Sequence, residues 1–99
     1  METFDRAEQA YLTYVAEHPN HYILNVPRTG STVPIMIHVA ECWSVSTSKQ
    51  TNYTTTEYFK IAFPGRDAAI AHAKALAEQR GIGWQVCQHC NAEPKQRSR

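Results

Sequence analysis

The chain has 99 residues, of which 42% are hydrophobic and 19% are charged, and its formal net charge is +1. This length and composition indicate one globular domain with one core, and no apolar run approaches the roughly 20 residues of a membrane helix. The near-neutral charge argues against a protein that coats nucleic acid through a broad basic face. The first ten residues, METFDRAEQA, lack the basic start and apolar centre of a secretory signal, so we expect a cytoplasmic protein with reduced cysteines.

Residues 3–18 carry apolar and aromatic side chains at helical spacing, which predicts a first helix that ends before Pro19. The members of this stripe are Phe4, Ala7, Tyr11, Tyr14, Val15 and His18. The opposite face is polar and acidic, with Glu2, Asp5, Gln9 and Thr13 at its centre and Glu8 and Glu17 on its flanks. They form either an ordinary solvated face or a docking surface for a basic partner.

Three strands are expected next, at residues 21–26, 32–45 and 53–63. In the second of them Glu41 interrupts an alternating apolar set, which indicates a bulge or an edge position near that residue. The Ser- and Thr-rich segment between the last two strands, with its centre at 46–52, has the composition of a hairpin connection that can carry binding.

Residues 59–87 read as strand, turn, helix and strand. Asp67 follows Pro64 and Gly65 and is the expected N-cap, while Gly81 is the expected left-handed terminator. The inward stripe of this helix is mostly alanine, which lets a helix lie close to a sheet. A last strand begins at Trp84.

The element order predicts an α+β fold in one domain spanning residues 1–90. We expect a largely antiparallel four-stranded sheet with both helices on one face, in the order helix, three strands, helix, strand. Residues 91–99 form a polar and basic tail that we expect to be disordered.

The sequence Cys87-Gln88-His89-Cys90 has the spacing of a zinc-binding motif, but a structural zinc site needs four ligands. Cys42 and His38 lie four residues apart on one predicted strand, or roughly 13 Å, so we expect that they cannot reach one ion together. The favoured expectation is therefore no cofactor, with zinc held by Cys87, His89 and Cys90 as the alternative. A redox role for this motif is disfavoured because it follows a strand and not a helix start.

No glycine-rich phosphate loop, GxSxG elbow or locally paired carboxylates appear, so we expect a protein that is not an enzyme and has no catalytic residues. The one catalytic arrangement left open is a pair formed by tertiary contact between Cys42 and either His38 or His72.

The module PGRDAAIAHAKALAEQRG between two strands, the small size and the helix-on-sheet layout resemble small orphan proteins of phages and mobile elements, including the anti-CRISPR inhibitors. The resemblance is architectural and covers about the whole chain. It implies a stoichiometric inhibitor in the host cytoplasm that docks on a bacterial nucleoprotein complex and blocks its target DNA. Many such inhibitors are strongly acidic DNA mimics, whereas this chain is near neutral and has only the first helix as an acidic surface.

We therefore expect a non-enzymatic binding protein that occludes a site on a larger protein or nucleoprotein partner. Its predicted partner surface combines polar residues of the first helix and of the loop: Asp5, Glu8, Gln9, Thr13, Glu17, Lys49 and Asn52. The alternative is a small zinc-binding or basic-tailed nucleic-acid accessory protein that uses Cys87, His89, Cys90 and the tail from Lys95 to Arg99. A homodimer joined through a sheet edge is a further possibility.

Overall fold

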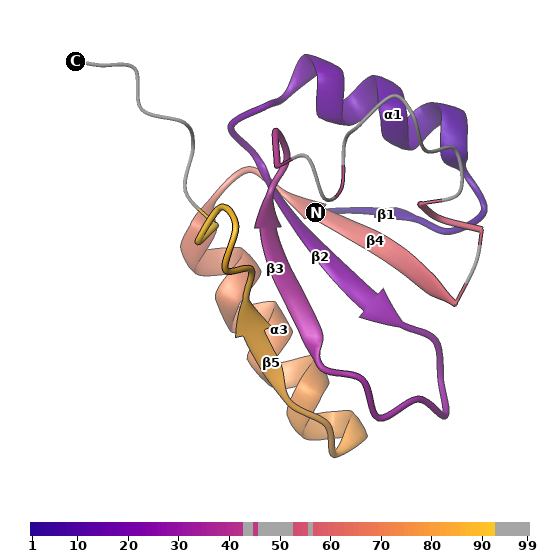
Figure 1. The fold of residues 1–99 in the computed structure, drawn as a ribbon, viewed down its shortest axis with the longest axis vertical. Helices are drawn as coiled ribbons and strands as arrows, with labels where there is room; N and C mark the ends of the chain where they lie inside the picture. Colours follow the sequence, from indigo (N-terminus) through magenta and orange to yellow (C-terminus); the bar gives the residue numbers. More distant parts are fainter. Residues whose placement is uncertain (43–44, 46–52, 56, 93–99) are drawn as a thin grey trace.

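The computed structural model describes residues 1–42, 45, 53–55 and 57–92 (Figure 1). In chain order the elements are β1 (Glu2–Phe4), α1 (Glu8–Glu17), β2 (Tyr22–Pro27), β3 (Ile35–Val39), β4 (Tyr58–Phe63), α3 (Arg66–Arg80) and β5 (Trp84–Val86). The prediction of an α+β fold in a single domain is confirmed. No helix formed by the described residues has the length and apolar character of a membrane span.

The strands form one five-stranded sheet in the order β1-β4-β2-β3-β5. β1 pairs with β4, β4 with β2 and β2 with β3, all antiparallel, whereas β3 and β5 are parallel. The prediction of a largely antiparallel sheet is confirmed for three of the four strand pairs, but the predicted number of strands is too small, because β1 adds a fifth. A parallel neighbour is what a strand, helix, strand connection produces when its second strand joins the same sheet.

One face of the sheet packs against α3. Leu24 lies between Ile37 and Ile61 in the strand register, and this apolar row meets the buried alanines of the helix. Ala73, at the middle of α3, is fully buried. The alanine stripe is thus a packing surface, as the sequence predicts.

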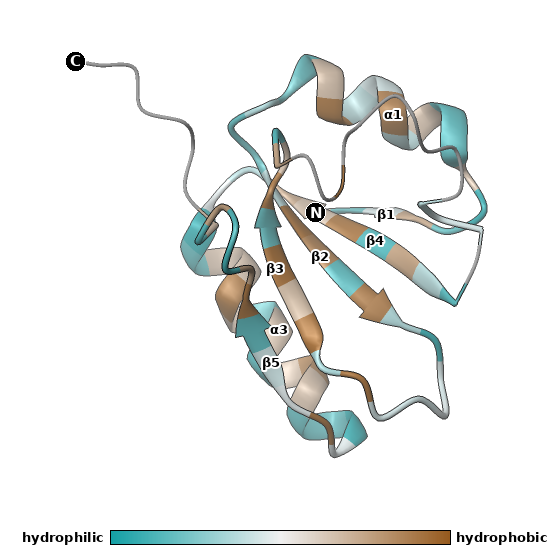
Figure 2. Cartoon of the chain, viewed as in Figure 1, coloured by the Kyte–Doolittle hydropathy of each residue, from teal (hydrophilic) through white to brown (hydrophobic). Residues whose placement is uncertain are grey.

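The opposite face is covered by α1. Ile23, Ala62 and the aromatic ring of Phe4 form a second core with Tyr11 and Val15 of the helix. The prediction that both helices lie on one face is wrong, since α1 and α3 cover opposite faces (Figure 1). β2 and β3 are largely hydrophobic along their length, as expected for strands that are covered on both sides (Figure 2).

Of the two predictions for the ends of α3, the one for the C-terminal end is correct and the one for the N-terminal end is wrong. Gly81 has φ 71° and its amide donates to the carbonyls of Ala77 and Glu78, while the amide of Ile82 also donates to Ala77, so the left-handed terminator is confirmed. The helix begins at Arg66 with Gly65 as N-cap, and no side chain caps it. Asp67 lies inside the first turn, where its charge still suits the positive end of the helix dipole.

The first predicted helix is also too long. Residues Glu2–Phe4 form the edge strand β1, and Arg6 then takes a left-handed conformation with φ 53° before α1 begins at Glu8. The apolar ring of Phe4 suits either a helix stripe or a half-buried strand, so the spacing alone does not separate the two.

Candidate metal centre

The chain turns sharply at the end of β3. The amide of Cys42 donates to the carbonyl of Val39 at 2.9 Å, and the amide of Glu41 donates to Pro19 at 3.2 Å. Cys42 therefore folds back toward the strand that it follows. The expectation that His38 and Cys42 lie too far apart to share an ion is wrong because the strand ends at Val39. Glu41, which interrupts the apolar alternation, lies in this turn.

The CQHC motif, residues 87–90, lies next to this turn although it is far from it in the sequence. Ile37 and Val86 are paired residues of the parallel strands β3 and β5, and the amide of Cys87 donates to the carbonyl of Ile37 at 2.9 Å. Because parallel strands end at the same edge of a sheet, the motif after β5 lies beside the turn after β3. The amide of Asn91 closes the motif on the carbonyl of Cys87 at 2.7 Å.

These two turns gather four potential metal ligands. One ligand atom from each of His38, Cys42, Cys87 and Cys90 lies within 4.8 Å of the others. Four tetrahedral ligands at zinc–sulfur distances of about 2.3 Å stand about 3.8 Å apart, so a contraction of about 1 Å would bring the four onto one ion. The three cysteines are free thiols.

His38 presents a nitrogen that no other described group uses. Its side chain is 6% exposed, and its Nδ1 atom is buried without a hydrogen-bond partner. Burial, followed by the charges of Lys60 and His89, lowers the pKa of His38 to about 4, so the ring is neutral at pH 7. A buried ring nitrogen without a partner is costly to the fold, and binding a metal ion would remove that cost.

The sulfur atoms are surrounded by hydrogen-bond donors. Burial alone would raise the pKa of Cys87, but the amides of Cys90 and His89 and the thiols of Cys42 and Cys90 lower it overall. Cys90 Sγ accepts a hydrogen bond from the amide of Val39 at 3.4 Å. Donors placed in this way stabilise thiolates, which are the form that binds metal.

The cluster corrects the predicted ligand set. Cys87 and Cys90 belong to it, whereas the ring of His89 does not: that residue donates its backbone amide to Cys87 Sγ at 3.3 Å. The two further candidate ligands in the cluster are His38 and Cys42. Of the two catalytic pairs that the sequence leaves open, His38 with Cys42 is part of the cluster, while His72 packs on Phe63 at the α3 side of the sheet.

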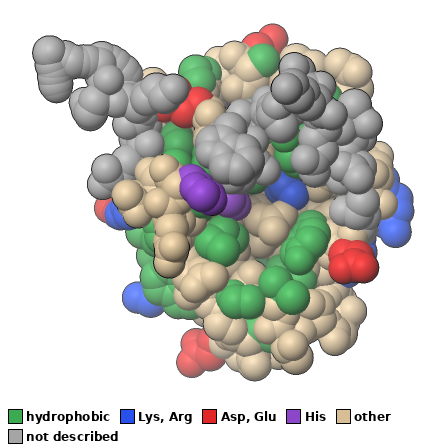
Figure 3. Space-filling view, in the orientation of Figure 1, with side chains coloured by type: hydrophobic (Ala, Val, Ile, Leu, Met, Phe, Trp, Pro, Cys, Tyr) green, Lys and Arg blue, Asp and Glu red, His purple; other side chains and the backbone are tan. Residues whose placement is uncertain are grey.

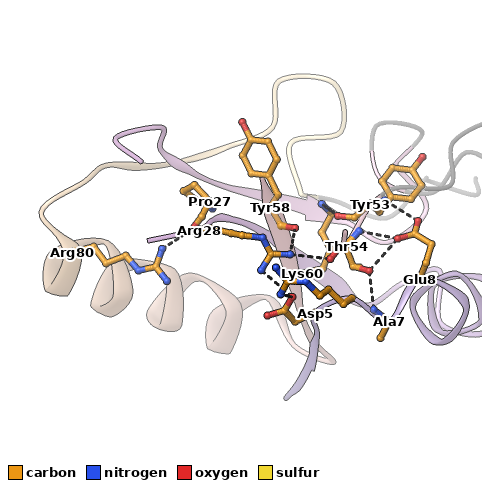
Figure 4. A network of polar contacts seen from close by, with 11 residues as sticks. Asp5, Ala7, Glu8, Pro27, Arg28, Tyr53, Thr54, Tyr58, Lys60 and Arg80 are labelled. Atoms are coloured by element: carbon orange, nitrogen blue, oxygen red, sulfur yellow. Dashed lines mark hydrogen bonds and ion pairs between the residues drawn. The ribbon is translucent and has the colours of Figure 1, made fainter. Parts of the chain in front are cut away.

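Two of the predicted partner-binding residues, Asp5 and Glu8, make contacts within the fold (Figure 4). Glu8 accepts hydrogen bonds from the amides of Tyr53 and Thr54 and from the hydroxyl of Thr54, at 2.7–3.0 Å. Asp5 forms ion pairs with Arg28 at 2.9 Å and with Arg6 at 3.2 Å. Both carboxylates therefore already form hydrogen bonds or ion pairs with other residues of the chain.

The other predicted partner-binding residues have a different outcome. Gln9, Thr13 and Glu17 line an open groove between α1 and β1. Lys49 and Asn52, with the rest of the 46–52 loop centre, lie outside the described residues, as does the tail from Lys95 to Arg99.

Charge is dispersed over the face of the molecule shown in Figure 3. Acidic and basic side chains are scattered around its rim, and the described residues form no broad basic patch there.

No family model matches the sequence, and no similar curated protein or solved structure was found. The likeness to phage-encoded inhibitors therefore stays a prediction.

Proposed function

We propose that this protein binds one zinc ion through His38, Cys42, Cys87 and Cys90, and that the ion stabilises the fold of a non-enzymatic binding protein. The observation that carries the proposal is the convergence of these four ligand atoms within 4.8 Å of one another. Three soft thiolates and one imidazole are a donor set that suits zinc. Four protein ligands leave no open position for a substrate or a water molecule, so the role is structural.

The metal would join two parts of the chain that are otherwise weakly connected. β5 has only three residues and lies at an edge of the sheet, and the turn after β3 leads to residues outside the described part of the chain. A zinc ion bound to both turns cross-links positions about 45 residues apart, which restricts the unfolded chain and secures β5 against β3.

The test is the metal content of untagged protein purified under reducing conditions. We expect one zinc ion per chain, and we expect Cys90→Ser and His38→Gln to lower this value strongly. His89→Gln is the matched control, because it removes a neighbouring imidazole that lies outside the cluster. Metal-free wild-type protein, or equal losses in His38→Gln and His89→Gln, would contradict the proposal.

A second function is stoichiometric binding to a larger partner, as the anti-CRISPR likeness implies. The groove between α1 and β1 supports it, because three of the predicted partner-binding residues line this groove. Glu17→Lys is a better probe than charge reversal at Asp5 or Glu8, whose carboxylates hold the fold together. Capture of a bacterial partner by the wild type and by Glu78→Lys, but not by Glu17→Lys, would support this function.

A further inference from the structure

The groove between α1 and β1 lies next to a free edge of the sheet. Its volume is about 560 Å³, and it is bounded by Glu2 and Phe4 on the strand and by Gln9, Thr13 and Glu17 on the helix. Among the strands that the described residues form, β1 is the outermost and pairs with β4 on one side only. Alternate backbone N–H and C=O groups of such a strand point away from the sheet, toward the position that another strand would occupy.

The helix is placed so that it flanks that position and does not close it. α1 packs through Tyr11 and Val15 onto the core formed with Ile23 and Ala62, while Thr13 and Glu17 are exposed along the groove. Figure 1 shows α1 running beside β1, on the face of the sheet that it covers. An added strand would thus pair with β1, and its side chains on one face would meet the groove-lining residues of the helix.

The groove is acidic. The carboxylates of Glu2 and Glu17 are exposed, and no described basic side chain forms an ion pair with either of them. This distinguishes them from Asp5 and Glu8, which are occupied by other segments of the chain. No lysine or arginine lines the groove, and the ring of Tyr14 adds an aromatic wall. Unpaired carboxylates beside an aromatic ring favour lysine or arginine side chains.

We propose that an extended basic segment of a partner protein adds to the free edge of β1 in this groove, with its lysine or arginine side chains facing Glu2 and Glu17. Main-chain hydrogen bonds to β1 would supply affinity, and the two carboxylates would select for positive charge. A second copy of this chain fits less well, because pairing two β1 edges places acidic side chains near one another. This inference deepens the partner-binding function proposed above, and it does not depend on the metal.

The test uses three labelled hexapeptides and the full-length, isotope-labelled protein. One peptide alternates lysine and valine, one alternates glutamate and valine, and one is the lysine peptide with a proline at a central position. We expect only the unbroken lysine peptide to bind, with amide chemical-shift changes confined to residues 2–4 and 9–18. The Glu2→Gln/Glu17→Gln double variant should bind about tenfold more weakly, as two partly exposed ion pairs imply, and Glu78→Gln should bind as the wild type does.

Three results would overturn the inference. One is a set of shift changes centred on another surface, and the second is equal binding of the proline-containing peptide. The third is self-association through β1 in the absence of peptide, seen as concentration-dependent shifts and a dimer mass by light scattering. If a lysate partner is captured equally by the wild type and by Glu17→Lys, the partner-binding function stands while this groove is excluded as its site.

Discussion

On the α3 side of the sheet, packing comes from a regular stripe of small side chains on one helix, whereas on the α1 side it depends on polar groups and on residues far apart in the sequence. Ala73 packs on neighbouring aliphatic side chains of the sheet. Across the sheet, the polar side chains of His38 and Lys60 are buried, and Glu8 bonds to residues more than 40 positions away. The comparison teaches that apolar periodicity predicts the first kind of packing, while the second kind becomes visible only when distant segments are brought together.

The largest effect is expected from removal of the metal. Chelation or Cys42→Ser should lower the free energy of unfolding by about 3–5 kcal/mol, because the proposed ion would cross-link the turns after β3 and β5. Chemical denaturation measures the change. Chelator should have no further effect on Cys42→Ser, and a full additional loss in that variant would contradict a shared site.

Lys60, which is buried on the α1 side of the sheet, should make the free energy of unfolding depend on pH. Its ammonium group donates to Asn25 and to the carbonyl of Tyr53, yet burial lowers its pKa to about 8. The unfolded chain holds this proton up to its ordinary pKa of about 10.5, so stability should rise between about pH 8 and pH 10.5, by at most about 3 kcal/mol.

The measurement compares denaturation of wild type and Lys60→Met across this pH range. The other titrating groups are common to both proteins, so their contributions cancel in the difference. A constant difference from pH 7.5 to 10.5 would show that Lys60 does not titrate in this way.

The packing of α3 on the sheet is best tested by enlarging one of its buried alanines. Ala73→Leu should cost about 1–3 kcal/mol, because Ala73 is fully buried and a larger side chain would have to displace its neighbours. Ala75→Leu, on the exposed side of the same helix, should change stability by less than about 0.5 kcal/mol. Zinc content should remain unchanged in both variants, and loss of zinc in Ala73→Leu would show that the two sides of the sheet are coupled.

The smallest effect on stability is expected when the carboxylates of Glu8 and Glu17, both in α1, are replaced one at a time by amides. Glu8→Gln should lower stability by about 1–2 kcal/mol, because the amides of Tyr53 and Thr54 would lose a charged acceptor. Glu17→Gln should be neutral within about 0.5 kcal/mol. Thermal unfolding of the two variants checks this, and equal losses would contradict the division of α1 into a structural start and a free groove face.

Sequence patterns predicted the parts of the fold whose signals are local. The alanine stripe and Gly81 identify α3 and its end, since both signals lie within one helix. β1 was missed because its apolar ring, Phe4, also fits the helical stripe that follows. The coverage of both faces was missed because His38 and Lys60 give the second face a polar character that is typical of a solvent-exposed side.

Only two of the four residues in the cluster could be predicted from the sequence. Cys87 and Cys90 form a local motif, but His38 and Cys42 join the cluster through a turn and a parallel strand pair that no local pattern specifies. The interruption at Glu41 was the available signal. Read as the end of the strand and not as a bulge, it places Cys42 in a turn that can bring its thiol back toward His38.

X-ray absorption at the zinc edge of the purified protein would decide whether the cluster is a metal centre. The structure predicts one zinc ion with three sulfur ligands at about 2.3 Å and one nitrogen ligand at about 2.0 Å. Oxygen-rich or two-sulfur coordination, or protein that contains no zinc while its thiols are reduced, would contradict it.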